Sequence, residues 1–124
     1  MVAGAVGLAS LGLSAPVRGR TVGGAMYGLI GRMTATTGQR DALTAILLEG
    51  LGRMPGCLSY VVAHDPVDDH ALWITEVWTD EAAHRASLQL PAVRDAIARG
   101  RPLIAGFGDA RVTAPIGGVG LAGG

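Results

Sequence analysis

The residues of this sequence with the greatest potential for chemistry lie in one stretch, residues 55–90. Glu76 and Trp78 share one face of a predicted strand, because residues two apart in a strand point to the same side. A carboxylate among bulky apolar neighbours is costly to bury alone, so we expect Glu76 to be paired with an arginine, a hydroxyl or a backbone donor. Glu76 is then either a structural pairing residue or a polar anchor or general base whose pKa burial raises.

Five other side chains have the chemistry to assist such a base. His84 is a candidate proton acceptor and Ser87 a candidate hydrogen-bond donor, both on the predicted helix after Trp78. Tyr60 and Trp78 are expected to form an apolar wall of a pocket, and Arg32 is a candidate substrate-binding residue. Each of these residue types is also common in ordinary cores and surfaces, so a purely structural role remains the alternative.

Metal and nucleophile chemistry are weakly supported. His64 and His70 flank a predicted turn and are expected to be solvated, and the aspartates of residues 65–69 lack the spacing of a calcium-binding loop. Cys57 is the only cysteine, so no intrachain disulfide or cysteine-based metal cluster is possible, and its place after Pro-Gly favours a small buried residue over a nucleophile. We therefore predict no metal site.

The hydrophobic pattern places these residues on an alternating set of strands and helices. Strand–helix–strand–strand–helix–strand is the order of the split βαβ, or ferredoxin-like, α+β fold, in which an antiparallel sheet carries its helices on one face. The predicted strands are 26–33, 57–64, 71–78 and 107–114, and the predicted helices are 38–54 and 81–90, the second capped by Asp80 and followed by a new helical turn at Pro91.

Length and charge restrict the class of protein. The chain has 124 residues, enough for one domain, which we assign to residues 26–114 between a flexible extension (1–25) and a glycine-rich tail (115–124). The formal net charge is zero and the ten basic residues, all arginine, are scattered, which disfavours nucleic-acid binding. The leading apolar run is shorter than the roughly 20 residues of a membrane span and lacks the preceding basic residues of an export signal, so we interpret it as a flexible extension or an upstream start, with a truncated export signal as the alternative. The single cysteine favours a reducing compartment, and we predict a cytoplasmic protein.

The predicted strands are apolar on both faces, whereas the predicted helices are too few to cover both faces of the sheet. Aromatic residues make up only 4% of the chain, so the core of one subunit is modest. We therefore predict that the open face of the sheet pairs two copies of the chain into a homodimer.

The order of these motifs resembles the antibiotic biosynthesis monooxygenase family over residues 26–113. The resemblance rests on Gly56 and Tyr60, the Glu76-x-Trp78 pair that closes a strand, and the Ala- and His-containing helix that ends in Leu-Gln-Leu-Pro. It implies a ferredoxin-like fold that pairs as a dimeric α+β barrel, with a pocket between helices and sheet. It also implies oxygenation of a quinol- or anthrone-like aromatic molecule by molecular oxygen, without a cofactor.

Two departures from the family pattern leave a second class of function open. Many quinol-oxidising relatives have histidines at the positions that align with Ser87 and Ala92. Haem-degrading relatives use Asn, Trp and His, whereas this chain has no Asn and has Ser87 in place of the Trp, which disfavours haem degradation. The chain is therefore either a small monooxygenase or a noncatalytic dimeric module of the same fold that binds a small ligand or stabilises another enzyme.

Overall fold

The computed structural model describes residues 25–50 and 54–121. The predicted N-terminal extension lies outside these residues except for Ala25, and residues 115–121 of the predicted tail contain no helix or strand. The elements in chain order are β1 (Tyr27–Ala35), α2 (Arg40–Glu49), β2 (Cys57–His64), β3 (Ala71–Trp78), α3 (Glu81–Ser87), α4 (Pro91–Gly100), the short 3₁₀ helix η2 (Arg101–Leu103) and β4 (Ile104–Thr113).

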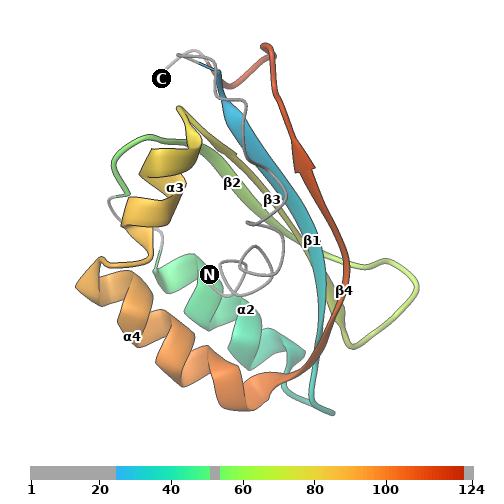
Figure 1. The fold of residues 1–124 in the computed structure, drawn as a ribbon. Coiled ribbons are helices and arrows are strands. Elements are labelled where there is room, and N and C mark those ends of the chain that lie inside the picture. The colour runs from blue at the N-terminus through green and yellow to red at the C-terminus, as the bar shows by residue number, and fades with distance from the viewer. Residues whose placement is uncertain (1–24, 51–53, 122–124) are drawn as a thin grey trace.

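The four strands form one sheet in the order β2-β3-β1-β4, and every neighbouring pair is antiparallel. The helices α2, α3 and α4 all lie on the same side of this sheet (Figure 1). Each helical connection joins two strands that have a third strand between them, which is the split βαβ arrangement. The predicted ferredoxin-like α+β fold is therefore confirmed.

Several element boundaries differ from the predicted ones. Strands β2 and β3 have the predicted bounds, but β4 begins at Ile104 rather than at residue 107. The predicted helix 38–54 is too long, because α2 ends at Glu49 and residues 51–53 lie outside the described residues. At the end of α2, Gly50 meets α4 so closely that a Cβ atom there would lie 3.3 Å from the Cβ of Ala96.

The turn at Gly56 fixes helix α3 against the end of β3. Gly56 has a φ of +85°, and a Cβ atom there would lie 2.6 Å from that of Ala83, so only glycine fits. The backbone N–H of Thr79 donates to the Gly56 carbonyl at 2.8 Å. The Asp80 carboxylate accepts from the Ala83 N–H at 2.8 Å, which confirms the predicted N-cap. These contacts hold the first turn of α3 beside Trp78 at the end of β3.

The core lies between the helices and the sheet. Residues of β1 and β3 that pair in register point to the same side, so the buried residues of both strands form one apolar surface under the helices. Leu43 and Leu47 of α2 pack against this surface. The sheet residues of the core are Tyr27, Leu29, Met33, Ala35, Leu72, Ile74 and Trp78.

The other face of the sheet has no helix of the described residues over it (Figure 1). Ile30, Thr75 and Val61 are neighbours across three strands on this open face, and 53% of Val61 is exposed.

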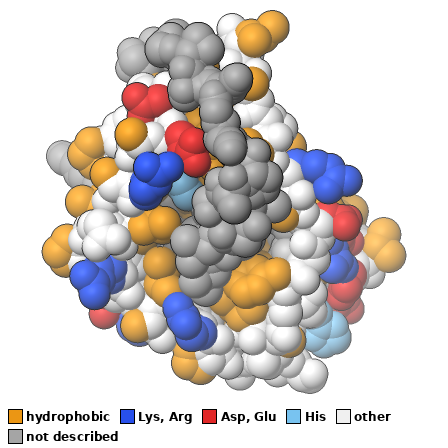
Figure 2. Space-filling model, in the orientation of Figure 1, with side chains coloured by type: hydrophobic (Ala, Val, Ile, Leu, Met, Phe, Trp, Pro, Cys, Tyr) orange, Lys and Arg blue, Asp and Glu red, His pale blue; other side chains and the backbone are white. Residues whose placement is uncertain are grey.

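On the face shown in Figure 2, acidic and basic side chains are interspersed among apolar ones. No helix within 25–50 or 54–121 is both long enough and apolar enough to cross a membrane.

Candidate functional site

Glu76 lies at the centre of the candidate site. It is in the middle of β3, opposite Leu29 of β1 on one side and Tyr60 of β2 on the other. Only 2% of Glu76 is exposed, so its carboxyl group is among apolar and aromatic side chains under the helices. A carboxyl group in such surroundings is expected either to have hydrogen-bond partners for its oxygens or to serve in binding or catalysis.

The two carboxyl oxygens of Glu76 have different surroundings. Oε1 accepts a hydrogen bond from Nε1 of Trp78 at 2.8 Å. Oε2 is buried and has no hydrogen-bond partner among the described residues. The expectation of an arginine, hydroxyl or backbone donor was therefore wrong. The donor is the indole of Trp78, which reaches the carboxyl group because the two side chains share one face of the strand.

The ionisation of Glu76 is shifted into the neutral range. Burial raises the pKa of Glu76 to about 7, and the hydrogen bond from Trp78 opposes this shift only in part. At neutral pH the side chain is thus present in both its protonated and its ionised form. A group with this pKa is suited to accept a proton and to return it.

His84 of α3 lies close to this carboxyl group. Its ring centroid is 5.5 Å from that of Tyr27 and 5.4 Å from that of Trp78, and the His84 and Trp78 rings make a T-shaped contact. Nε2 of His84 is 4.0 Å from Oε1 of Glu76. Burial lowers the pKa of His84 to about 4, so the imidazole is neutral at neutral pH and this contact is not an ion pair.

Tyr27 is a member of this cluster that sequence reasoning missed. It is the first residue of β1, pairs with Trp78 and is buried against His84. Its alternation with Leu29 was a usable signal for the helix-covered face. Burial raises the pKa of Tyr27 to about 12 and that of Tyr60 well above its ordinary value, so both phenols stay protonated at neutral pH.

Ser87 lies one turn beyond His84 and is also buried. Its hydroxyl donates to the backbone carbonyl of His84 at 2.6 Å, close to the end of α3. Its single proton is therefore used within the helix, although its oxygen can still accept. Ser87 is close in sequence to the predicted site, but its hydrogen bond is structural.

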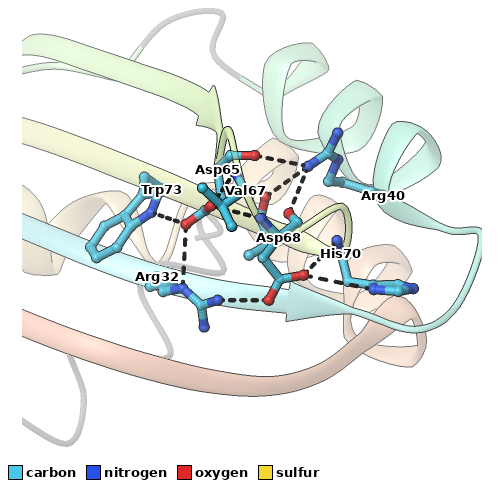
Figure 3. A network of polar contacts seen from close by, with 8 residues as sticks. Arg32, Arg40, Asp65, Val67, Asp68, His70 and Trp73 are labelled. Carbon is cyan, nitrogen blue, oxygen red and sulfur yellow. Dashed lines mark hydrogen bonds and ion pairs between the residues drawn. The ribbon is translucent and has the colours of Figure 1, made fainter.

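Arg32 is not brought to this cluster. It pairs in register with Trp73, on the sheet face away from the helices. Its guanidinium contacts Oδ2 of Asp68 at 2.8 Å and Oδ2 of Asp65 at 3.7 Å (Figure 3). The indole of Trp73 donates to Asp65 at 2.8 Å, so Trp78 alone of the two tryptophans faces Glu76.

The loop between β2 and β3 is held by the same polar network. Nη1 of Arg40 in α2 lies within 3.1–3.4 Å of the backbone carbonyls of Asp65, Asp68 and Ala71 (Figure 3). Backbone N–H donors, that of Asp68 first, and the indole of Trp73 lower the pKa of Asp65 to about 2. The aspartates thus bind arginine and backbone, and no group of three or more His, Cys, Asp or Glu within the described ranges is placed to hold a metal ion.

Cys57 is half-buried at the start of β2 and packs against the core. Burial raises the pKa of its thiol to about 11, so the thiolate is scarce at neutral pH. This environment suits a small packing residue rather than a nucleophile.

The fold and these side chains together define a ferredoxin-like α+β domain with a candidate acid–base site between its sheet and helix α3. The family model for antibiotic biosynthesis monooxygenases matches residues 26–99, and this chain belongs to that family.

Solved structures agree with this assignment. A crystal structure from Chloroflexus aurantiacus, described as a candidate antibiotic biosynthesis monooxygenase, is 64% identical and covers 77% of this chain and 98% of its own, with a TM-score of 0.76. The fold is shared with SnoaB from Streptomyces nogalater, described as a cofactor-independent oxygenase, at 18% identity and a TM-score of 0.62 over 77% of this chain and 97% of that one. No curated protein matches this chain significantly.

Proposed function

We propose that this protein is a cofactor-independent monooxygenase of a quinol- or anthrone-like aromatic substrate, with Glu76 as the base. The observation that carries the proposal is a carboxyl group that is 2% exposed, has a pKa raised to about 7, and has one oxygen without a partner among the described residues. Family membership and the structural likeness to SnoaB support the reaction class.

The reaction needs no external reductant, because the substrate supplies the electrons. Glu76 takes a proton from the substrate, and the resulting anion passes one electron to molecular oxygen. The two radicals combine through a new C–O bond to give a peroxide, which breaks its O–O bond and releases water. For an anthrone, the methylene carbon becomes a carbonyl: one oxygen atom enters the product, and the other leaves in water with the two hydrogens of the methylene.

In this reaction, the side chains of the site transfer protons and bind the aromatic ring. Glu76 removes the proton through Oε2, and neutral His84 is the second proton acceptor. Trp78 and Tyr60 are expected to pack against the aromatic ring of the substrate. Arg32 is left out of this proposal, because it is paired with aspartates on the opposite face of the sheet.

Aerobic turnover tests this function directly. A panel of hydroquinones and anthrones is offered under labelled oxygen, with a metal chelator present throughout. We expect one oxygen molecule consumed per substrate, with one labelled atom in the product. The proposal fails if no member of the panel is turned over faster than in buffer.

The second candidate is a noncatalytic module that binds a small aromatic ligand or stabilises another enzyme. It is favoured by the commitment of the Ser87 proton to a backbone carbonyl, because a donor at that position is then missing from the site. Binding of a quinone without any turnover would select this alternative. In either case we propose a cytoplasmic location, since the chain has a single cysteine and no disulfide.

His84→Gln and Ser87→Ala separate a chemical role from a structural one. We expect His84→Gln to lower kcat by about 10²-fold, since a positioned acid or base contributes about 10²- to 10⁴-fold. We expect Ser87→Ala to leave kcat nearly unchanged and to lower stability by about 1 kcal/mol, through one lost hydrogen bond. Steady-state kinetics and urea unfolding measure both effects. A loss of rate in Ser87→Ala equal to that in His84→Gln would contradict this division.

We also expect the chain to form a homodimer through the open face of its sheet. Ile30 and Val61 belong to this face, which no helix of the described residues covers. Light scattering at micromolar concentration should give twice the chain mass of 12.6 kDa. A monomer that persists at this concentration would refute the expectation.

The chain offers a matched pair of variants for the dimer. Val61→Glu buries a charge in the proposed interface and should give the mass of one chain. Val67→Glu makes the same change in the exposed loop after β2, where the side chain is 88% exposed, and should leave the mass unchanged. Equal masses for the two variants would locate the interface elsewhere.

A further inference from the structure

We propose that Oε2 of Glu76 distinguishes the reduced from the oxidised form of the aromatic ligand through its own protonation. In the ionised state it accepts the hydroxyl proton of a hydroquinone, and in the protonated state it donates to the carbonyl of a quinone. The ligand class rests on the function proposed above, whereas the selection between oxidation states is a separate property of the site.

The geometry assigns the proton to one oxygen. The indole N–H of Trp78 can only donate a hydrogen bond, and it donates one to Oε1 at 2.8 Å. When the carboxyl group is neutral, Oε1 is therefore the carbonyl oxygen and the proton is on Oε2. Oε2 is also the oxygen without a partner among the described residues. A ligand that reaches this carboxyl group thus meets an acceptor in one state and a donor in the other.

The two oxidation states of the ligand differ in what they offer to this atom. A quinone carbonyl can only accept, so placing it against an ionised Oε2 leaves two buried acceptors facing each other, which is costly. A hydroquinone hydroxyl donates to the ionised oxygen in a charge-assisted hydrogen bond, which is stronger than a neutral one. The hydroquinone hydroxyl can also accept a hydrogen bond from protonated Glu76, so the hydroquinone can bind both states of the carboxyl group. The quinone can bind only the protonated state and is therefore the more selective ligand.

Glu76 is the group facing the site whose charge is expected to change near neutral pH. From α3, His84 has a pKa lowered to about 4 by burial. The phenols of Tyr27 and Tyr60 and the thiol of Cys57, on β1 and β2, have their pKa values raised by burial and remain neutral. On α3, Glu81 and Arg85 pair with each other at 3.2 Å.

Anaerobic binding tests the inference without turnover. The probes are 1,4-naphthohydroquinone and 1,4-naphthoquinone, titrated between about pH 5.5 and 8.5. The chain has two tryptophans, so a Trp73→Phe background leaves Trp78 as the only indole to report binding by fluorescence. One linked proton predicts that the quinone Kd rises about tenfold for each pH unit above the pKa of Glu76, while the hydroquinone Kd falls as the pH rises.

Variants identify the titrating group. Glu76→Gln keeps the size of the side chain but cannot ionise, so it should flatten both pH profiles. Glu49→Gln makes the same change at the exposed end of α2, where Glu49 contacts Arg99, and should keep the pH dependence of the parent. As a measurement that needs no variant, the ¹³C carboxyl signal of Glu76 should titrate at a higher pH with quinone bound and at a lower pH with hydroquinone bound.

The outcomes separate this inference from the proposed function. Parallel pH profiles for the two ligands, or an unchanged quinone profile in folded Glu76→Gln, would overturn the inference. If hydroquinones are still turned over aerobically, the proposed function stands. If neither ligand binds and no substrate is turned over, both are overturned. Opposite shifts of the Glu76 carboxyl signal support the inference even if the Gln variant does not fold.

Discussion

Replacing Glu76 by Gln is expected to lower kcat by about 10²- to 10⁴-fold, the usual contribution of a positioned base. The amide keeps the volume and can still accept from Trp78, so the site stays packed while its proton acceptor is lost. In the parent, kcat/KM should rise as the pH passes through about 7, where Glu76 of the ligand-free protein ionises. The variant should lack this rise. Steady-state kinetics over this pH range measure both effects.

Glu49→Gln is the matched control for this experiment. Glu49 is exposed at the end of α2 and its carboxylate contacts Arg99 of α4 at 3.3 Å. Its replacement should leave kcat and its pH profile unchanged. A Glu76→Gln variant that melts like the parent and retains full activity would exclude Glu76 as the base and leave His84 as the candidate.

Trp78→Ala is expected to lower the free energy of unfolding by about 3–5 kcal/mol, the usual cost of emptying a large buried aromatic site. Trp78 is 1% exposed and makes a T-shaped ring contact with His84. Its removal also takes away the hydrogen bond to Oε1 of Glu76, which leaves a second buried acceptor unsatisfied. Urea unfolding followed by far-UV circular dichroism measures the change.

Trp78→Phe separates the two parts of this loss. Phenylalanine fills most of the space but has no N–H, so the cavity is small while the hydrogen bond to Glu76 is lost. We expect a destabilisation of about 1–3 kcal/mol, the cost of one buried unsatisfied acceptor, together with a further rise in the pKa of Glu76. A loss below about 1 kcal/mol for Trp78→Ala would show that the ring does not support the core.

The strands were the most predictable part of this fold. The bounds of β2 and β3 could be predicted from the sequence because proline, glycine and aspartate residues lie at the ends of clear apolar runs. The end of α2 could not be predicted, since the apolar spacing of Leu43 and Leu47 continues to Leu51 in the sequence. The close contact of Gly50 with α4 is tertiary, and no local pattern indicates it.

The site was predictable where it depends on alternation within a strand and unpredictable where it depends on register between elements. The shared face of Glu76 and Trp78 follows from their spacing. The position of Tyr27 against His84 depends on the pairing of β1 with β3 and on the direction of α3, which a single sequence does not specify. The contacts of Arg32 with Asp65 and Asp68 are likewise tertiary, and no local pattern of β1 indicates them.

The contacts of Arg40 with the loop between β2 and β3 determine whether this loop can accept inserted residues. The loop after β2 is polar and exposed at its tip, which is the composition that engineers choose for inserting tags. Its carbonyls are nevertheless bound by one side chain of α2, and the amides of Val67 and Asp68 are bound by the Asp65 carboxylate. Lengthening the loop would therefore disconnect a helix from a hairpin, which makes it a poor site for insertion.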